Sequence, residues 1–97
     1  MKIEILVPDY SPEGSLMLAR EANSKLTSRL EATLDEVLIS GNPEGLRTLG
    51  TALLALAGPT VPSHFHIHMD QRNGWLAPGS IDLIIEVMKD DPSYSQS

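Results

Sequence analysis

Cysteine is absent from the 97 residues of this chain, and aromatic residues make up only 4% of it. Without cysteine there is no disulfide framework, no thiolate metal site and no cysteine nucleophile, so packing must supply the stability. Long apolar runs are lacking as well: no stretch is long enough to span a membrane, and positions 1 to 20 hold no apolar run with a basic flank. We therefore expect a cytoplasmic protein that does not contact a membrane.

Basic residues are also few, seven against thirteen acidic ones, which gives a net charge of −6. This balance argues against a partner that presents a phosphate backbone, so we expect no nucleic acid. It is typical of an acidic surface that meets a basic partner, and ordinary solubility would explain it as well. At this length the chain has room for one hydrophobic core, so we predict a single domain over residues 1–89 and a disordered tail over residues 90–97.

The stretch from residue 42 to residue 58, NPEGLRTLGTALLALAG, predicts a helix. Asn42 is a good N-cap, Pro43 suits the first helical position, and Gly58 followed by Pro59 ends the helix. Leucines at spacings of three and four mark the face that we expect to be buried against a sheet. The expected buried face comprises Leu46, Leu49, Leu53 and Leu56, and the opposite face comprises Glu44, Arg47, Thr48, Thr51 and Ala55.

Alternating and β-branched apolar residues predict strands on both sides of this helix. The expected strands cover residues 2–7, 15–20, 25–31, 36–40, 64–70 and 80–88. Residues 15–35 also carry apolar residues at helical spacing, so one long helix is the alternative there. Together these elements predict an α+β fold of two layers, in which an antiparallel sheet of five or six strands has one helix packed on one face.

The predicted strand HFHIHMD alternates strictly between polar and apolar residues. His64, His66 and His68 would therefore share one face, with neighbouring imidazoles about 6.5 to 7 Å apart. Two imidazoles at that separation can share a metal ion, and carboxylates on adjacent strands would complete such a site. The candidate carboxylates are Glu4, Asp82 and Glu86. The same pattern is also typical of ordinary cross-strand pairing, and no third ligand stands at a fixed spacing, so we expect no bound metal or cofactor.

Recognisable catalytic motifs are missing. No serine stands in a GxSxG context, and Pro43 inside GNPEG removes an N–H group that a phosphate-binding loop would use. We therefore do not expect an enzyme. Trp75, the single tryptophan, follows the turn-forming pair Asn73 and Gly74 before the last strand, where it would either cover the edge of the core or anchor a partner.

Several short patterns, taken in order, resemble the immunity protein 32 family of bacterial polymorphic toxin systems. They are SLML from residue 15, VLISGNPEGLRTLGTALLALAG from residue 37, VPSHFHIHMD from residue 61 and GSIDLIIE from residue 79. The resemblance covers roughly residues 14–87. It implies a small α+β protein that binds and neutralises a toxin encoded beside it, and it favours strands over a helix for residues 15–31.

The acidic balance and this resemblance together predict an immunity protein whose cognate toxin is a basic, nuclease-type domain, bound through an acidic, histidine-bearing face of the sheet. The residues expected at this interface are Glu4, His66, His68, Asp70, Trp75, Asp82 and Glu86. Two alternatives of other classes stay open: a small metal-dependent enzyme that uses the HxH strand, and a homodimeric module that pairs through an exposed strand edge. Metal content would identify the first, and the mass in solution would identify the second.

Overall fold

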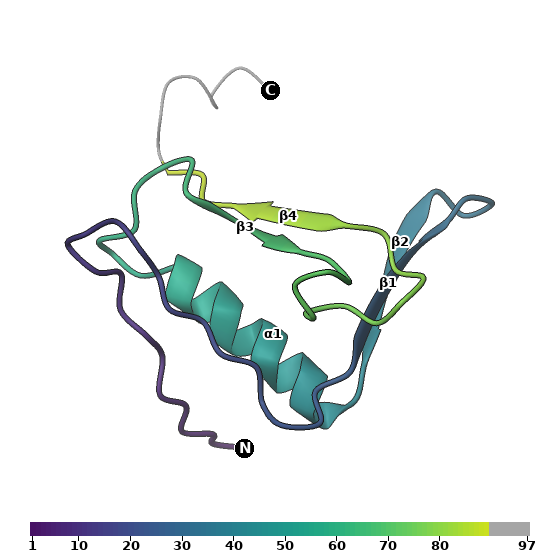
Figure 1. The fold of residues 1–97 in the computed structure, drawn as a ribbon, viewed down its shortest axis with the longest axis horizontal. Coiled ribbons are helices and arrows are strands. Elements are labelled where there is room, and N and C mark those ends of the chain that lie inside the picture. Colours follow the sequence, from purple (N-terminus) through teal and green to yellow (C-terminus); the bar gives the residue numbers. More distant parts are fainter. Residues whose placement is uncertain (90–97) are drawn as a thin grey trace.

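One helix and four strands make up the regular structure of residues 1–89, the part of the chain that the computed structural model describes (Figure 1). In chain order they are β1 (Leu26–Glu31), β2 (Glu36–Gly41), α1 (Pro43–Leu56), β3 (His66–Met69) and β4 (Leu83–Glu86). The predicted α+β class is confirmed. The single sheet of five or six strands is wrong, because β1 and β2 form one two-stranded antiparallel sheet and β3 and β4 form another. The tail predicted over residues 90–97 lies outside the described residues.

Helix α1 begins where the sequence predicts it, and its N-cap also fixes the chain before β1. The side-chain oxygen of Asn42 accepts hydrogen bonds from the backbone N–H of Gly45 at 2.7 Å and of Lys25 at 2.9 Å. The amide nitrogen of the same side chain donates to the backbone oxygen of Asn23 at 2.8 Å. One asparagine therefore satisfies a free donor of the first turn and holds the preceding segment against the helix.

The buried face of α1 differs from the predicted one. The helix buries Gly45, Thr48, Ala52, Ala55 and Leu56, although Thr48 and Ala55 were expected on the exposed side. Leu49 is half-buried, and Leu46 and Leu53 are 50% and 43% exposed. Small residues face inward because the chain before β1 passes close to the helix: a Cβ at position 45 would lie 2.0 Å from the backbone oxygen of Lys25. The leucines mark one apolar stripe, but the neighbouring stripe of small residues allows the closer packing.

Residues 1–25 form no strand, so the strands predicted over residues 2–7 and 15–20 are wrong, as is the alternative of one long helix over residues 15–35. Figure 1 shows the dark-blue part of this stretch running alongside α1 as irregular chain. Ile5, Leu6, Met17 and Ala19 line a groove together with Thr48 and Thr51 of α1. Most of the large apolar side chains of this stretch stay exposed, Leu6 to 96% and Met17 to 79%. The strand predicted over residues 25–31 is confirmed as β1.

Polar contacts attach this irregular stretch to α1. The backbone N–H of Glu21 donates to the Thr48 hydroxyl at 3.0 Å, and the Glu21 carboxylate accepts two hydrogen bonds of 2.9 Å from the Arg47 guanidinium. The hydrogen bonds from Arg47 lower the pKa of the Glu21 carboxyl below its usual value, and the same bonds raise the pKa of Arg47. Both side chains are more than two-fifths exposed, so this ion pair orders the segment and adds little stability.

The two sheets are joined through the outer edge of β1. The backbone oxygen of Leu26 accepts a hydrogen bond from the N–H of Ala77 at 2.8 Å, and the backbone oxygen of Ser28 accepts one from the N–H of Ile81 at 3.0 Å. The Ser28 hydroxyl donates to the backbone oxygen of Ile81, and the Ser28 N–H donates to the Ser80 hydroxyl at 3.3 Å. Every polar group of Ser28, which is only 1% exposed, is therefore hydrogen-bonded.

The hydrophobic core lies between α1, β1 and the β3–β4 sheet. Its fully buried members are Leu26, Ala52, Met69 and Leu76, and Leu18, Leu49, Ile67, Trp75, Leu83 and Ile85 pack against them. The alternation predicted for the last two strands is confirmed, because Met69 is fully buried and the other inward residues of β3 and β4 are half-buried, while the residues between them are exposed. This sheet therefore has one face toward the core and one face exposed to solvent.

Two glycines of α1 provide a matched test of the close packing. Gly50 has open space where a Cβ would stand, whereas a Cβ on Gly45 would collide with the backbone of Lys25. We expect Gly50→Ala to stabilise the protein by about 0.5–1 kcal/mol, the usual gain of alanine over glycine in a helix. We expect Gly45→Ala to destabilise it by about 1–3 kcal/mol, because the helix and Lys25 must separate. Urea unfolding measures both, and equal effects would contradict the close approach.

A second pair of variants tests which leucines carry the core. Leu26 is 2% exposed and belongs to the core cluster, whereas Leu53 is 43% exposed on α1. We expect Leu26→Ala to lower the free energy of unfolding by about 2–5 kcal/mol, as large-to-small core changes do. We expect Leu53→Ala to lower it by less than about 1 kcal/mol. If Leu53→Ala lowered the free energy of unfolding more than Leu26→Ala did, the helix would bury the leucine face that the sequence predicted.

Candidate partner-binding surface

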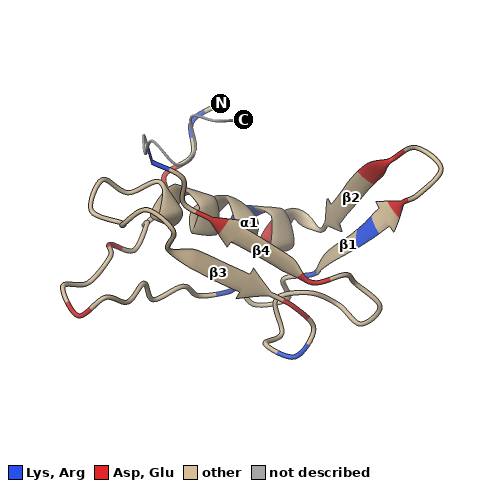
Figure 2. Ribbon diagram, turned by 90° about the horizontal axis from the view of Figure 1, so that it is seen from above, with Lys and Arg blue, Asp and Glu red and all other residues tan. Residues whose placement is uncertain are grey.

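The exposed face of the β3–β4 sheet carries several of the predicted site residues. In the antiparallel register His66 lies opposite Glu86 and His68 lies opposite Ile84, so these four side chains share one face. All four are exposed, Ile84 to 64%. Figures 1 and 2 show α1 on the other side of this sheet. The histidine face, as we call these four residues, therefore combines two imidazoles, one carboxylate and one aliphatic side chain.

His64 adds a third imidazole at one end of the histidine face. It stands before β3 with a positive φ of 72°, a backbone conformation that is rare for residues with a Cβ. Its backbone N–H donates to the oxygen of Val87 at 2.8 Å, which extends the pairing of the two strands. Its Nδ1 lies 3.9 Å from Oε1 of Glu86, and its backbone oxygen lies 3.1 Å from Nδ1 of His66. Two histidines and Glu86 therefore gather where β4 ends.

The imidazoles do not converge on a common point. The rings of His66 and His68 lie edge to face, with centroids 5.0 Å apart and planes at 75°. Among residues 1–89, no group of three or more His, Cys, Asp or Glu side chains is arranged to hold a metal ion. The Nδ1 of His66 faces the backbone oxygen of His64 at 3.1 Å, which fixes the orientation of this ring on the sheet. The geometry fits a polar contact surface.

Asp70 belongs to the turn that follows β3. Its carboxylate accepts a hydrogen bond from the backbone N–H of Asn73 at 2.7 Å. The Asn73 side chain in turn accepts one from the N–H of Asp70 at 3.1 Å and donates to the backbone oxygen of His68 at 2.7 Å. Gly74 has a φ of 81°, as the predicted Asn-Gly turn requires. Asp70 thus orders the loop that carries Trp75.

Trp75 is half-buried and packs against the core cluster. It also lines a shallow groove of about 330 Å³ together with residues 16–18, Ile67 and His68. The indole therefore covers an edge of the core, as one of the two sequence interpretations expected. Its remaining surface borders the histidine face through His68, so its role as an anchor for a partner stays a prediction.

The two remaining predicted residues lie in different places. Asp82 is exposed immediately before β4, at the end of the sheet where Asp70 follows β3. Glu4 is exposed in irregular chain, and its neighbours line the groove against α1. The strand that was expected to carry Glu4 to the histidines is not formed, so Glu4 lies in exposed irregular chain.

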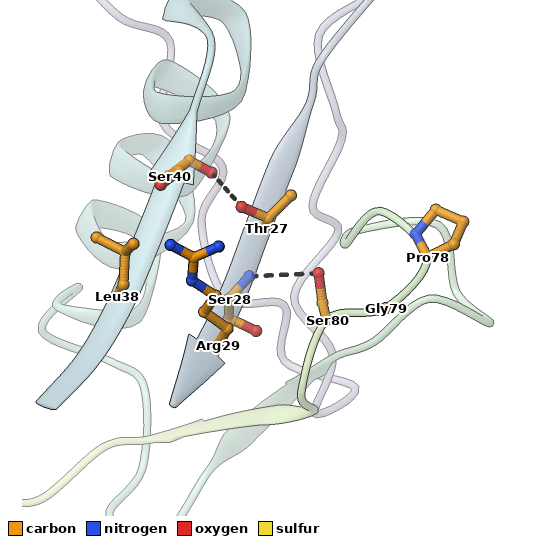
Figure 3. Close-up of a pocket in the computed structure, with 8 residues that line it drawn as sticks. All are labelled: Thr27, Ser28, Arg29, Leu38, Ser40, Pro78, Gly79 and Ser80. Carbon is orange, nitrogen blue, oxygen red and sulfur yellow. Dashed lines mark hydrogen bonds between the residues drawn. The ribbon is translucent and has the colours of Figure 1, made fainter. Parts of the chain in front are cut away.

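A second exposed surface, which the sequence interpretation missed, lies on the β1–β2 hairpin. Figures 1 and 2 show this hairpin projecting from one end of the fold. Its large exposed apolar side chains, between 39% and 64% exposed, are Leu30, Leu34, Val37, Leu38 and Ile39. The strand predicted over residues 36–40 is confirmed as β2, and the structure leaves both of its faces open. A shallow pocket of about 250 Å³ lies where the hairpin meets residues 78–80 (Figure 3).

Negative charge is placed at the ends of the strands rather than along their faces (Figure 2). On the second sheet, Glu86 lies at one end of the histidine face and Asp82 lies at the other. At the tip of the hairpin Glu31 lies opposite Glu36, and Arg29 forms an ion pair of 2.7 Å with Glu31. The histidine face is therefore bordered by carboxylates, and a basic partner would meet charge at its rim.

The fold and its open sheet face define a small α+β binding protein. The family model described as immunity protein 32 matches residues 36–88, more than half of the chain, and the chain belongs to the immunity protein 32 family. The match spans β2, α1, β3 and β4. Searches of curated proteins and of solved structures returned no match. The resemblance found in the sequence is thus confirmed, and membership implies an immunity protein that neutralises a cognate toxin, typically as an inhibitor without enzymatic activity.

Within residues 1–89, α1 is the single helix, and it is neither long nor apolar enough to cross a membrane.

We predict that the purified protein holds no stoichiometric zinc or iron when no metal is added. The reason is geometric, since a protein site for either metal needs three or four converging ligands and the three histidines do not converge. Elemental analysis of the parent protein and of His66→Ala and His68→Ala variants measures the metal content. Stoichiometric metal that is lost in either variant would contradict this expectation and support the metal-dependent enzyme.

Proposed function

We propose that this chain neutralises a basic, nuclease-type toxin domain by binding it through the histidine face of the β3–β4 sheet. The observation that carries the proposal is the family match over residues 36–88, because immunity proteins act on cognate toxins and the matched segment includes both strands of this sheet. The proposal places the protein in the cytoplasm, where an intracellular nuclease would meet it.

The chemistry of the histidine face suits a basic partner. Glu86 and Asp82 provide exposed carboxylates at its two ends, within a chain whose net charge is −6. Complementary charge raises the rate of encounter and rejects wrong partners. Ile84 supplies an exposed apolar contact between the carboxylates, which matches the apolar centre and polar rim of typical interfaces.

Binding at this face would inhibit a nuclease by occupying its substrate site. A nuclease presents basic side chains to the phosphate backbone of its substrate. Carboxylates spaced along a rigid sheet can occupy the same basic groups, while His66 and His68 offer hydrogen bonds to neighbouring polar groups. Trp75 would lie at one edge of this interface, and Asp70 would contribute mainly by ordering the loop. Glu4 would take part only if the toxin extends to the segment along α1.

The metal-dependent enzyme remains the alternative of another class, and no arrangement of the described side chains favours it over binding. Self-association through a strand edge is compatible with toxin binding, because the free edges and the histidine face are different surfaces.

The binding face is tested by reversing its charge. We expect Asp82→Lys and Glu86→Lys, singly and together, to slow association with the toxin domain encoded beside this chain and to flatten the salt dependence of that rate. Each change should lower the association rate constant by roughly threefold to tenfold at low salt. Stopped-flow or surface-based kinetics at several salt concentrations measure the effect. Asp9→Lys, an equal charge change on an exposed loop residue, is the matched control.

Trp75→Ala distinguishes an anchor from a residue that only supports the core. An anchor speeds dissociation, whereas a purely structural tryptophan lowers the unfolding midpoint and leaves the dissociation rate of the folded protein unchanged. If all of these substitutions leave toxin binding intact, the histidine face is not the interface. Failure of the parent protein to bind the neighbouring toxin at all would overturn the proposed function itself.

A further inference from the structure

The direction of the peptide groups in the β1–β2 hairpin identifies one unpaired strand edge. The backbone oxygen of Leu26 and both backbone groups of Ser28 point away from β2, because they bond to residues 77–81. Backbone groups alternate in direction along a strand, so the residues between them face β2. With Ser28 opposite Ile39 and Leu30 opposite Val37, the N–H and C=O groups of Val37 and Ile39 point outward. Among the described residues, no hydrogen bond reaches these outward groups.

The side chains along this edge are apolar and exposed. Val37 is 55% exposed, Leu38 39% and Ile39 41%. On the face that carries Val37 and Ile39, the cross-strand neighbour Leu30 is 56% exposed as well. Natural edge strands are usually protected by lysine, proline or a bulge, and β2 has none of these. An edge with unpaired backbone groups and exposed apolar side chains can pair with another strand.

We propose that β2 pairs antiparallel with β2 of a second copy of this chain, about a two-fold axis that passes beside Leu38. Among the registers that the outward groups allow, we take the one centred on Leu38, in which Val37 lies opposite Ile39 of the partner subunit and Leu38 lies opposite the partner's Leu38. Four backbone hydrogen bonds then form between the two edges. The two hairpins become one four-stranded sheet.

A second copy fits this edge better than an unrelated strand, because the edge is complementary to itself. In the central register Glu36 lies opposite the partner's Ser40, so no two like charges are directly opposed. Val37 and Ile39 of both copies form one continuous apolar stripe with the two Leu30 side chains, and the two Leu38 side chains meet on the other face. A basic strand from a toxin would find no carboxylate in the middle of this edge.

The expected dimer is weak. One pair of short strands buries less than the roughly 1,200–2,000 Å² that stable protein interfaces bury. Dimerisation should therefore depend on concentration in the micromolar range or above. The pairing goes beyond the proposed function and leaves the histidine face of each copy free, so that a dimer could hold two toxin domains.

Cross-linking tests the register directly, because the chain has no cysteine of its own. Leu38 and the partner's Leu38 form a non-hydrogen-bonded pair, whose Cα atoms lie about 4.5 Å apart, within the range that a disulfide spans. We expect Leu38→Cys to give a covalent dimer within minutes of mild oxidation. Ser40→Cys is the matched control, since the two positions 40 lie more than about 13 Å apart in this register. Equal cross-linking of both variants, or none of Leu38→Cys, overturns the proposal.

Sedimentation equilibrium tests the association without a covalent bond. We expect the parent chain to show a monomer–dimer equilibrium and Val37→Lys to raise its dissociation constant roughly tenfold or more, because two lysines then share one sheet face. Leu54→Lys, at a site on α1 that is 52% exposed, should leave the equilibrium unchanged. A parent chain that stays monomeric, while Val37→Lys weakens toxin binding instead, would assign this edge to the toxin and overturn self-pairing.

Discussion

Hydrogen bonds between the outer edge of β1 and residues 77–81, from the backbone and from two serine hydroxyls, join the two halves of this protein. Each of the two sheets has only two strands, which is too few for independent stability in water. The bonds at Leu26 and Ser28 give β1 a second partner and join the hairpin to the chain that enters β4. They also allow Leu26 to be buried at the centre of the core cluster without leaving its peptide oxygen unpaired.

The packing of α1 also depends on close contact between segments that are separate in the chain. The helix contacts irregular chain before β1 as well as the sheets, and irregular chain has no flat surface into which leucines can interlock. Gly45 lets the backbones approach, and the Asn42 side chain bonds to the first turn of the helix and to the chain before β1. The half-buried Leu49 still reaches the core, which leaves Leu46 and Leu53 at the surface.

Local chemistry predicted the elements that have local causes. The cap at Asn42, the turn at Asn73 and Gly74 and the alternation of β3 all depend on residues a few positions apart, and all three are present. The strand expected over residues 2–7 is not formed. Alternation predicts which side chains a strand would bury, but it does not predict whether another strand is available to pair with it. Glu4 was misplaced for the same reason. The histidine face was predictable from a period of two, whereas the exposed edge of β2 depends on long-range pairing that the sequence does not reveal.

The hydrogen bonds that join the two sheets also limit when the protein can finish folding during its synthesis. Two of these hydrogen bonds connect residues that are 52 and 53 positions apart in the chain. A ribosome that has produced β1, β2 and α1 has therefore made a hairpin with two open edges and a helix that can contact only the irregular chain before β1. Contacts between such distant positions form late and slow the folding of a small domain. The joint between the two sheets can therefore form only after the segment around residue 80 has been synthesised, when nearly the whole fold is already present.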